Sequence, residues 1–381
     1  MTASKLGMAL GIYIHVPFCR TRCSFCAFYL RIHREDWAQA YVEALAREIR
    51  LHAAQNSLGG RPPDSLYFGG GTPTTLRPDQ LVEILTLVRG SFGLARQAEV
   101  TVEAHPDSVT EEGLQTLREA GFNRISFGLQ SADENELLQV GRKTERASVD
   151  LAIAHARAAG FANLNLDLIY GLPGQTLASW HETLAQALAL APDHLSCYAL
   201  TVEEKTHLQV SLHRGDLPEP DQDRQNDMED QAALRLAEAG FDRYEISNYS
   251  RPGFACRHNL LYWQGGEYLG LGPSAQSYLN GCRFGNVEDL TAYQAEVAAG
   301  RLAAVQTEQL SPAQRRREAL VFGLRLIEGV SLNGASEGDA DQWGQKLQRL
   351  EREGLIELKA GRVRLTALGR RFADQVAVEL L

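Results

Sequence analysis

Short apolar runs alternate with amphipathic stretches through the first 200 residues of the chain. The apolar runs predict six β-strands, at residues 12–16, 65–68, 99–104, 124–130, 163–170 and 194–200. Apolar residues at helical spacing predict helices at residues 37–52, 78–88, 147–159 and 176–190, with Thr110 placed to cap another. This order predicts an α/β fold of parallel β/α units, with strands side by side in a barrel-like sheet. The alternation alone leaves a full eight-stranded barrel and an open sheet as alternatives.

The pattern weakens over residues 203–300. One helix is clear at residues 222–239, where Gly240 ends it. Residues 244–249 are consistent with one more strand, and the glycine-rich tract 265–272 is interpreted as a close-packed loop.

The last 80 residues have a different pattern. Residues 311–326 and 339–353 predict helices, residues 355–358 and 363–365 a hairpin, and Thr366 caps a final helix, an order that resembles a winged-helix module. Residues 301–381 hold 13 Lys/Arg against 11 Asp/Glu, so the basic run 315–317 is interpreted as a solvated helix start rather than a DNA contact. We therefore expect three parts, at residues 1–202, 203–300 and 301–381.

The net charge, the lengths of the apolar runs and the cysteine distribution argue against several classes of protein. The whole chain of 381 residues carries a net charge of −10, which disfavours nonspecific nucleic-acid binding. No apolar run approaches the ~20 residues of a membrane span, and residues 1–11 lack the apolar core of a signal peptide. Three of the six cysteines are clustered and three are scattered, which is not a disulfide framework and fits a reducing, cytoplasmic setting.

The clustered cysteines, Cys19, Cys23 and Cys26, follow the first predicted strand with the spacing C-x3-C-x2-C. A disulfide would leave one thiol over, and a structural zinc ion would need a fourth ligand, for which His15 or His33 is available. Thiolates also bind iron–sulfur clusters, and three of them leave one iron of a [4Fe–4S] cluster without a protein ligand.

Polar and glycine residues lie at the ends of the other predicted strands. A glycine run follows the second strand, Glu103 ends the third, Gln130 ends the fourth, and Asp167 lies in the fifth. Because parallel strands present their C-terminal ends at one edge, we expect these groups to gather near the cysteines.

The cysteine spacing, with Phe25 before the last cysteine, resembles the signature of the radical S-adenosylmethionine (SAM) enzymes. The longer run 12–19, Ile-Tyr-Ile-His-Val-Pro-Phe-Cys, resembles the branch that holds the oxygen-independent coproporphyrinogen III oxidases and the HemW haem chaperones. The resemblance implies a partial (β/α)6 barrel and a [4Fe–4S] cluster whose open iron is chelated by the methionine end of SAM. It also implies an electron donor that reduces the cluster, so that SAM is cleaved to a 5′-deoxyadenosyl radical.

The same resemblance implies a set of SAM-binding residues. Residues 69–74, Gly-Gly-Gly-Thr-Pro-Thr, match the family loop that contacts the methionine amino end, and residues 167–175 resemble the branch motif DLIYGLP-x-Q. A guanidinium suits the SAM carboxylate, and carboxylates suit its amine and hydroxyl groups. The residues predicted to bind SAM are Tyr13, Phe25, Gly70, Gly71, Thr72, Glu103, Gln130, Arg142 and Asp167.

Two features favour the haem chaperones within the branch. The oxidases carry a further cysteine where this chain has Phe28, and they have a longer N-terminal extension. Residues 258–263, His-Asn-Leu-Leu-Tyr-Trp, match the HNxxYW motif of the HemW chaperones, which implies haem binding by His258, Asn259, Tyr262 and Trp263. Neutral imidazole can ligate haem iron, and the aromatic rings offer flat faces to a porphyrin.

The resemblance thus implies a chaperone that binds haem and passes it to an apoprotein acceptor of the respiratory chain. Coproporphyrinogen III oxidation is the alternative, and whether the protein is an enzyme stays open. A radical SAM enzyme acting on RNA would need a basic domain, which the chain lacks. No membrane span is expected, and peripheral contact with a membrane stays open.

Two positions depart from the family pattern. Relatives usually have Asn where this chain has His105, and His where it has Thr144. At these two positions we therefore expect the SAM pocket to differ from that of the relatives.

Overall fold

The computed structural model describes residues 9–332 and 337–381, without the side chains of residues 337–342. Residues 1–8, where we expect no signal-peptide core, lie outside the described residues. Within the described part of the chain, no helix combines the length and apolar character needed to cross a bilayer.

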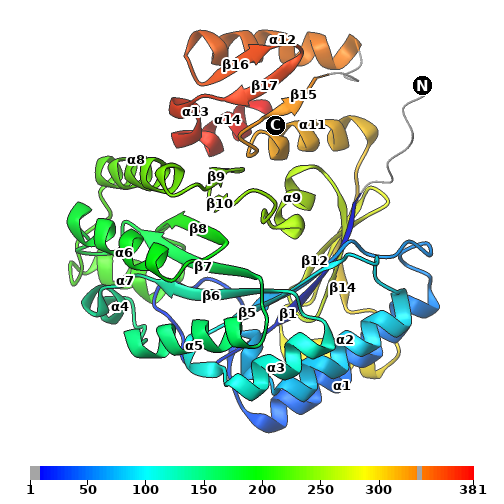
Figure 1. The fold of residues 1–381 in the computed structure, drawn as a ribbon. Coiled ribbons are helices and arrows are strands. Elements are labelled where there is room, and N and C mark those ends of the chain that lie inside the picture. Colours follow the sequence, from blue (N-terminus) through cyan, green and yellow to red (C-terminus); the bar gives the residue numbers. More distant parts are fainter. Residues whose placement is uncertain (1–8, 333–336) are drawn as a thin grey trace.

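Six parallel strands form the centre of the molecule (Figure 1). In spatial order they are β1 (Leu10–Val16), β4 (Ser65–Gly70), β5 (Glu99–Ala104), β6 (Arg124–Gln130), β7 (Asn163–Tyr170) and β8 (His194–Ala199). The helices on their outer side are α1 (Glu35–Ala54), α2 (Pro78–Phe92), α3 (Glu111–Ala120), α5 (Arg146–Ala158), α6 (Leu177–Ala189) and α8 (Gln222–Glu238). The sheet curves without closing, so the predicted partial (β/α)6 barrel is confirmed, and residues 9–332 and 337–381 do not form a full eight-stranded barrel.

Side chains alternate between the two faces of these strands, apart from the end of β6. In β1, Leu10, Ile12, Ile14 and Val16 are fully buried in the core cluster shared with the helices, while the positions between them face the barrel interior. The inward positions of the six strands are mostly polar, whereas parallel strands buried on both faces are normally apolar throughout. The barrel interior is therefore built as a polar lining.

The sheet continues beyond β1 through residues whose structure differs from the prediction. The tract 265–272, interpreted as a loop, contains β11 (Glu267–Leu271), which pairs in parallel with β1. The prediction was wrong because glycine carries little strand propensity. These glycines are required by close packing: a Cβ on Gly270 would lie 2.1 Å from the Gln276 carbonyl oxygen, and one on Gly272 2.6 Å from that of His15.

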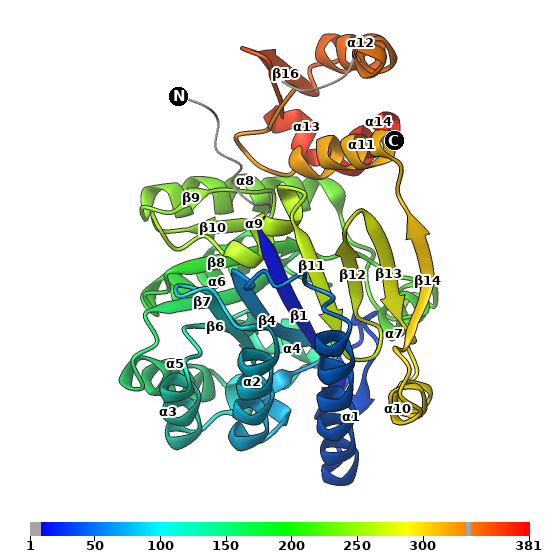
Figure 2. The ribbon, with the colours of Figure 1, turned by 90° about the vertical axis from the view of Figure 1, so that its right-hand side faces the viewer.

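Antiparallel strands complete both edges of the sheet. Beyond β11 come β12 (Gln276–Leu279), β13 (Cys282–Asn286) and β14 (Ala304–Gln309), with α10 (Leu290–Ala298) between the last two (Figure 2). At the other edge, the strand expected at residues 244–249 is shorter: β10 (Asn248–Ser250) pairs with β8 and with β9 (Asp242–Arg243). Three short helices lie in connections: α4 (Glu134–Gln139), α7 (His207–His213) and α9 (Arg257–Trp263).

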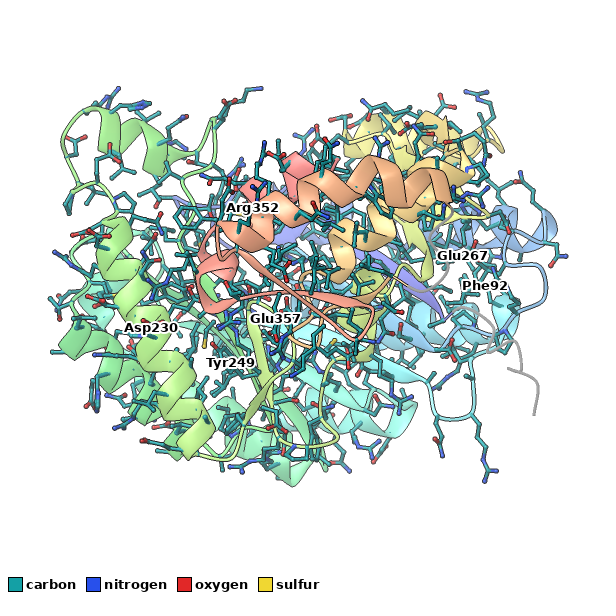
Figure 3. All side chains as sticks on the ribbon, turned by 90° about the horizontal axis from the view of Figure 1, so that it is seen from above. Phe92, Asp230, Tyr249, Glu267, Arg352 and Glu357 are labelled. Carbon is teal, nitrogen blue, oxygen red and sulfur yellow. The ribbon has the colours of Figure 1, made fainter. Side chains whose placement is uncertain are left out.

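The C-terminal unit has its own hydrophobic core. It contains α11 (Pro312–Gly323), α12 (Glu337–Arg352), α13 (Ala367–Arg371), α14 (Ala373–Leu380) and a sheet of β15 (Val330–Ser331), β17 (Arg362–Leu365) and β16 (Ile356–Lys359). The predicted hairpin and the Thr366 cap are present, the cap accepting a hydrogen bond from the Gly369 amide at 3.0 Å. Seen from above, this unit lies across one end of the barrel, with Glu357 over the centre (Figure 3).

Candidate functional site at the barrel mouth

The three clustered cysteines lie on a loop at the C-terminal end of β1. Two short strands, β2 (Phe18–Cys19) and β3 (Arg31–Ile32), pair in parallel and hold the loop between them. Within it, the Ser24 amide donates to the Val140 carbonyl at 2.9 Å, and the half-buried Phe25 ring packs on an apolar cluster that includes Val140. The loop is thus anchored at both ends and in the middle.

Two adjoining cavities open at this end of the barrel. The larger, about 440 Å³, is lined by Cys19, Cys23, Cys26, Phe25, Gly70, Gly71, Thr72, Gln130 and Arg142, among others. The smaller, about 110 Å³, adds Glu103 and Asp167 and shares Thr72, Gln130 and Arg142 with the first. Every residue predicted to hold the cluster or SAM therefore lines one of them except Tyr13.

Tyr13 lies deeper in the barrel. Its hydroxyl is 3.3 Å from His15 Nδ1, and its ring stacks beside Tyr67 and His258, with centroids 6.2 and 6.4 Å away. It forms the floor below the cavities rather than their wall.

The thiols face polar groups of the neighbouring strand ends. Cys19 Sγ is 3.4 Å from Thr72 Oγ1, and Arg142 Nη1 is 4.0 Å from Cys23 Sγ. Burial raises the pKa of Cys19 to about 11 and also raises that of Cys26, so iron binding must displace their protons. Among the described side chains, no group of three His, Cys, Asp or Glu is arranged around a single ion. In a [4Fe–4S] cluster each thiolate binds a different iron, so the sulfurs surround the cluster.

The glycine loop after β4 allows the backbone to approach the cysteine loop closely. A Cβ on Gly71 would lie 2.5 Å from the Phe18 carbonyl oxygen, and Gly70 has a φ of 108°. The Thr72 amide donates to the same carbonyl at 2.7 Å. Only glycine permits this contact, so the loop sequence is fixed by the approach of the two backbones.

Gln130 and Arg142 are positioned by an irregularity at the end of β6. The register shifts between Gly128 and Gln130, and Gln130 has a φ of 66°, which is unusual for a residue other than glycine. Arg142 donates through Nη2 to the Gly128 carbonyl. Its Nε is buried and has no hydrogen-bond partner among the described residues, which is the property expected of a group that awaits an anionic ligand.

Two carboxylates line the smaller cavity in different environments. Tyr67 donates to Glu103 Oε1 at 2.8 Å, and burial, together with the nearby Asp167 charge, raises the pKa of Glu103 to about 8. Asp167 accepts from Ser126 Oγ at 2.8 Å and Asn165 Nδ2 at 2.9 Å. At neutral pH Glu103 is therefore largely protonated until a cationic group binds beside it.

His105 and Thr144, the two residues that depart from the family pattern, contact each other. His105 Nε2 is 3.3 Å from Thr144 Oγ1, and His105 Nδ1 accepts from the Asp107 amide at 3.2 Å. This second bond leaves the proton on Nε2, which donates to Thr144. Burial and the nearby Arg142 lower the pKa of His105 to about 4, so it lines the cavities as a neutral group.

Sequence reasoning did not identify the polar groups below the cavities. Asn165 donates to Asp167 and accepts from His194 Nδ1 at 2.6 Å, and His194 Nε2 accepts from Tyr244 Oη at 2.8 Å. The Tyr244 hydroxyl accepts from the backbone amide of Cys256, the N-cap of α9, at 3.3 Å. A hydrogen-bonded path thus runs through the barrel to α9, and the alternation of polar residues along the strands was the signal for it.

The HNxxYW segment forms α9 at the opposite end of the barrel. His258 packs beside Gly11 and Ser65, at the N-terminal ends of β1 and β4. The cysteine loop follows the other end of β1, roughly 20 Å away at about 3.3 Å per strand residue. Tyr13 is thus the one predicted SAM residue whose ring stacks beside a predicted haem residue, and the predicted SAM residues at the barrel mouth lie apart from α9.

Within α9, the predicted haem residues point to different surroundings. His258 is buried, and its Nδ1 and Nε2 both form 2.8 Å hydrogen bonds, with Ser65 Oγ and Tyr262 Oη. Burial lowers its pKa to about 3, and no ring nitrogen is free, so His258 does not fit as a direct iron ligand in this arrangement. Tyr262 and Trp263 line a third cavity, whereas Asn259 is half-buried and lines none of the cavities described here.

Comparison with known proteins finds similar sequences and a similar structure over nearly the whole chain. The model of the Radical SAM superfamily matches residues 13–187, and that of the HemN C-terminal domain matches residues 310–372. The protein "Heme chaperone HemW" of Synechocystis is 39% identical over 85% of this chain and 80% of its own, and that of Mycobacterium tuberculosis 37% identical over 98% and 95%. The solved structure of Escherichia coli coproporphyrinogen III oxidase (HemN) superposes with a TM-score of 0.86, at 27% identity over 98% of this chain and 90% of that one.

Proposed function

Because the chain belongs to the HemW family of radical SAM proteins, we propose that it binds haem and a SAM-coordinated [4Fe–4S] cluster and transfers the haem to an acceptor protein. The acceptor is an apoprotein, of the respiratory chain in our proposal. The observation that carries the cofactor assignment is the gathering of three thiols, a glycine loop and an unpartnered arginine nitrogen around one pair of cavities.

The cluster fits the donor set at the barrel mouth. Cys19, Cys23 and Cys26 would hold three of its irons, and the cavity beside them has room for a further chelating ligand. When bound, the cluster and SAM together supply one-electron chemistry, with an external protein as electron donor.

The residues around the cavities fit the groups of SAM. Arg142 would pair with the methionine carboxylate, since its Nε has no other partner. Glu103 would receive the amine or a hydroxyl: a cationic amine beside it favours the carboxylate form and displaces its proton. Gly71 and Thr72 would hold the ligand through backbone groups, and Phe25 would cover the apolar side of the cavity.

Haem binding and transfer are supported by the relatives, which are named heme chaperones. In this chain the aromatic groups available to a porphyrin are Tyr262 and Trp263, while His258 holds Tyr262 in place through its 2.8 Å hydrogen bond. The haem would therefore be contacted away from the barrel mouth.

The test uses anaerobically reconstituted full-length protein. We expect about four irons per chain and a change in the electron paramagnetic resonance (EPR) spectrum of the reduced cluster on adding SAM. Cys19→Ala should lose the cluster, whereas Cys282→Ala, a matched half-buried cysteine in β13, should keep it. Haem titration should shift the Soret band relative to that of free haem, and the loaded protein should pass its haem to apomyoglobin, used as a trap.

Two results would overturn the proposal. The first is a titration that leaves the Soret band of free haem unshifted, and the second is SAM-dependent conversion of coproporphyrinogen III to protoporphyrinogen IX. The second would assign the chain to the oxidase activity of the E. coli protein that it resembles in structure.

A further inference from the structure

The loop that carries the three cysteines is basic, although the chain as a whole is acidic. Residues 17–34 contain four arginines and no Asp or Glu, whereas the full chain has a net charge of −10. Arg31 and Arg34 each form an ion pair at 2.8 Å with an aspartate outside this segment. The excess positive charge of the loop therefore comes from Arg20 and Arg22.

Arg20 and Arg22 hold their charge at the surface. Both are exposed, and each donates to a backbone carbonyl, Arg20 to that of Asp107 at 2.9 Å and Arg22 to that of Cys26 at 3.4 Å. Neither forms an ion pair with a carboxylate of residues 9–332 or 337–381. Both guanidinium groups can therefore pair with a carboxylate of another molecule.

A third exposed cation comes from the neighbouring loop between α4 and α5. The Ser24 amide donates to the Val140 carbonyl, so this loop lies beside the cysteines. Lys143 is exposed and lines the larger cavity, whose lining residues include three cations and one carboxylate, that of Asp107. Three thiolates, an oxidised cluster and SAM together sum to about zero charge, so a loaded site leaves the mouth net positive.

Exposed apolar side chains lie on the cysteine loop as well. Phe28 is 64% exposed and follows Cys26 by two residues, and Ile32 of β3 is 52% exposed. Two residues span at most about 7 Å, so a molecule that contacts Phe28 lies close to the cysteines. Exposed apolar residues with charged residues around them are the arrangement found in protein interfaces.

We propose that this surface, formed by Phe28, Arg20, Arg22 and Lys143 and here called the cysteine-loop face, docks an electron-carrier protein with an acidic surface. The proposal rests on the proposed function, because it assigns a place to the donor that reduces the cluster. One electron passes from the flavin hydroquinone anion of the carrier, which becomes the neutral semiquinone, to the oxidised cluster, which becomes reduced. No proton is transferred in this step.

Charge decides the class of partner. An acidic carrier is repelled by most of a chain whose net charge is −10 and is attracted by the cysteine-loop face, so its encounters concentrate near the cluster. Electron-transfer complexes have small interfaces, for which a few side chains suffice. An anionic membrane would be attracted by the same cations, and the experiment distinguishes it from a protein.

The binding test needs no electron transfer. Oxidised flavodoxin, an acidic flavin carrier, is titrated into the anaerobically reconstituted protein with SAM, and its affinity is measured by calorimetry at low and high salt. Arg22→Gln and Lys143→Gln should each raise the Kd about threefold at low salt, since each removes one exposed cation, and less at high salt. Phe28→Ala should raise the Kd about tenfold at both salt concentrations, because it removes an apolar contact.

Matched controls lie on the outer helices. Arg47→Gln removes an exposed arginine of α1, and Leu234→Ala removes a leucine of α8 that is 62% exposed. Neither should change the affinity for flavodoxin. A wild type that binds no flavodoxin, or three face variants that bind it as the wild type does, would overturn the proposal.

The rate of reduction separates this proposal from the proposed function. Flavodoxin hydroquinone should reduce the three face variants more slowly by the same factors, followed by the absorbance of the semiquinone. Dithionite, a small reductant that needs no docking surface, should reduce all variants at the wild-type rate, with unchanged iron content and SAM affinity. If dithionite gives no SAM-responsive cluster in the wild type, the proposed function fails. If it does and flavodoxin reduces all variants alike, only the docking proposal fails.

Vesicles that contain phosphatidylserine test the membrane as the occupant. We expect the wild type to bind flavodoxin and the three face variants to bind the vesicles as the wild type does. Vesicle binding that is lost in these variants, without flavodoxin binding to the wild type, would assign the cysteine-loop face to a membrane and overturn the proposal.

Discussion

Arg142→Gln tests the SAM site, because the Arg142 guanidinium has a buried nitrogen without a hydrogen-bond partner among the described residues. The guanidinium contacts the Gly128 carbonyl through Nη2 and lies 4.0 Å from Cys23 Sγ through Nη1, while Nε is buried and unpartnered. Glutamine removes the charge and the planar fork but keeps a polar side chain of moderate length. The variant therefore removes the interaction with an anionic ligand and leaves the cysteines in place.

The magnitude follows from the environment of the side chain. Arg142 is half-buried, so a hydrogen bond from its guanidinium to the SAM carboxylate is only partly screened by water. A charge-assisted bond in that setting contributes about 2 kcal/mol, or roughly a 30-fold increase in the Kd for SAM when it is lost. The Kd of Arg142→Lys for SAM should fall between those of the wild type and Arg142→Gln, because lysine keeps the charge and loses the planar fork.

The assay is equilibrium dialysis of SAM against the anaerobically reconstituted protein, with iron content measured on the same sample. Arg96→Gln, at an exposed arginine in the loop before β5, serves as the control for loss of one exposed charge. Unchanged SAM affinity in Arg142→Gln, within twofold and with full iron content, would refute the assignment of the carboxylate to this residue.

Three further predictions follow from other parts of the structure. Gly71→Ala should lose most of its iron and SAM binding because its Cβ would lie 2.5 Å from the Phe18 carbonyl oxygen, whereas Gly90→Ala, with open space around it, should keep both. Burial raises the pKa of Glu48 from 4.5 to about 7, so the free energy of unfolding should fall by on the order of 3 kcal/mol between pH 4.5 and 7 through this group. In urea unfolding, Glu48→Gln should lack that decline. Equal pH dependence of the unfolding free energy in the two proteins would contradict this prediction. His258→Gln should bind haem more weakly but with an unchanged Soret maximum, since the imidazole is not the iron ligand, and a shifted maximum would show that it is.

The strands of the barrel could be predicted from sequence because their signal is local. Residues 99–104, 124–130 and 163–170 are strands with the predicted bounds, since each is an apolar alternation closed by a polar or glycine turn. The strand β11 could not be predicted, because its partner β1 lies some 250 residues earlier and its glycines weaken the local pattern. Its position depends on packing against β12 and the end of β1.

In the candidate site, too, some features could be predicted from local sequence and others depend on packing between distant segments. Placing Glu103 and Gln130 near the cysteines needs only the rule that parallel strands end at one edge, and the structure has them lining joined cavities. The position of α9 at the opposite end depends on β11 running beside β1, so the local sequence gave no indication that the haem motif lies far from the cysteines. The third cavity depends further on α11 docking against the barrel, which no local pattern encodes.

The central claim is that one chain holds a SAM-bound cluster and haem in separate places. The direct measurement is the EPR spectrum of the reduced, SAM-bound cluster before and after titration with haem, with the Soret band recorded on the same sample. We predict that the shift of the Soret band saturates while the SAM-dependent cluster signal stays unchanged. An unshifted Soret band, or loss of the SAM-dependent signal as haem enters, would contradict the account.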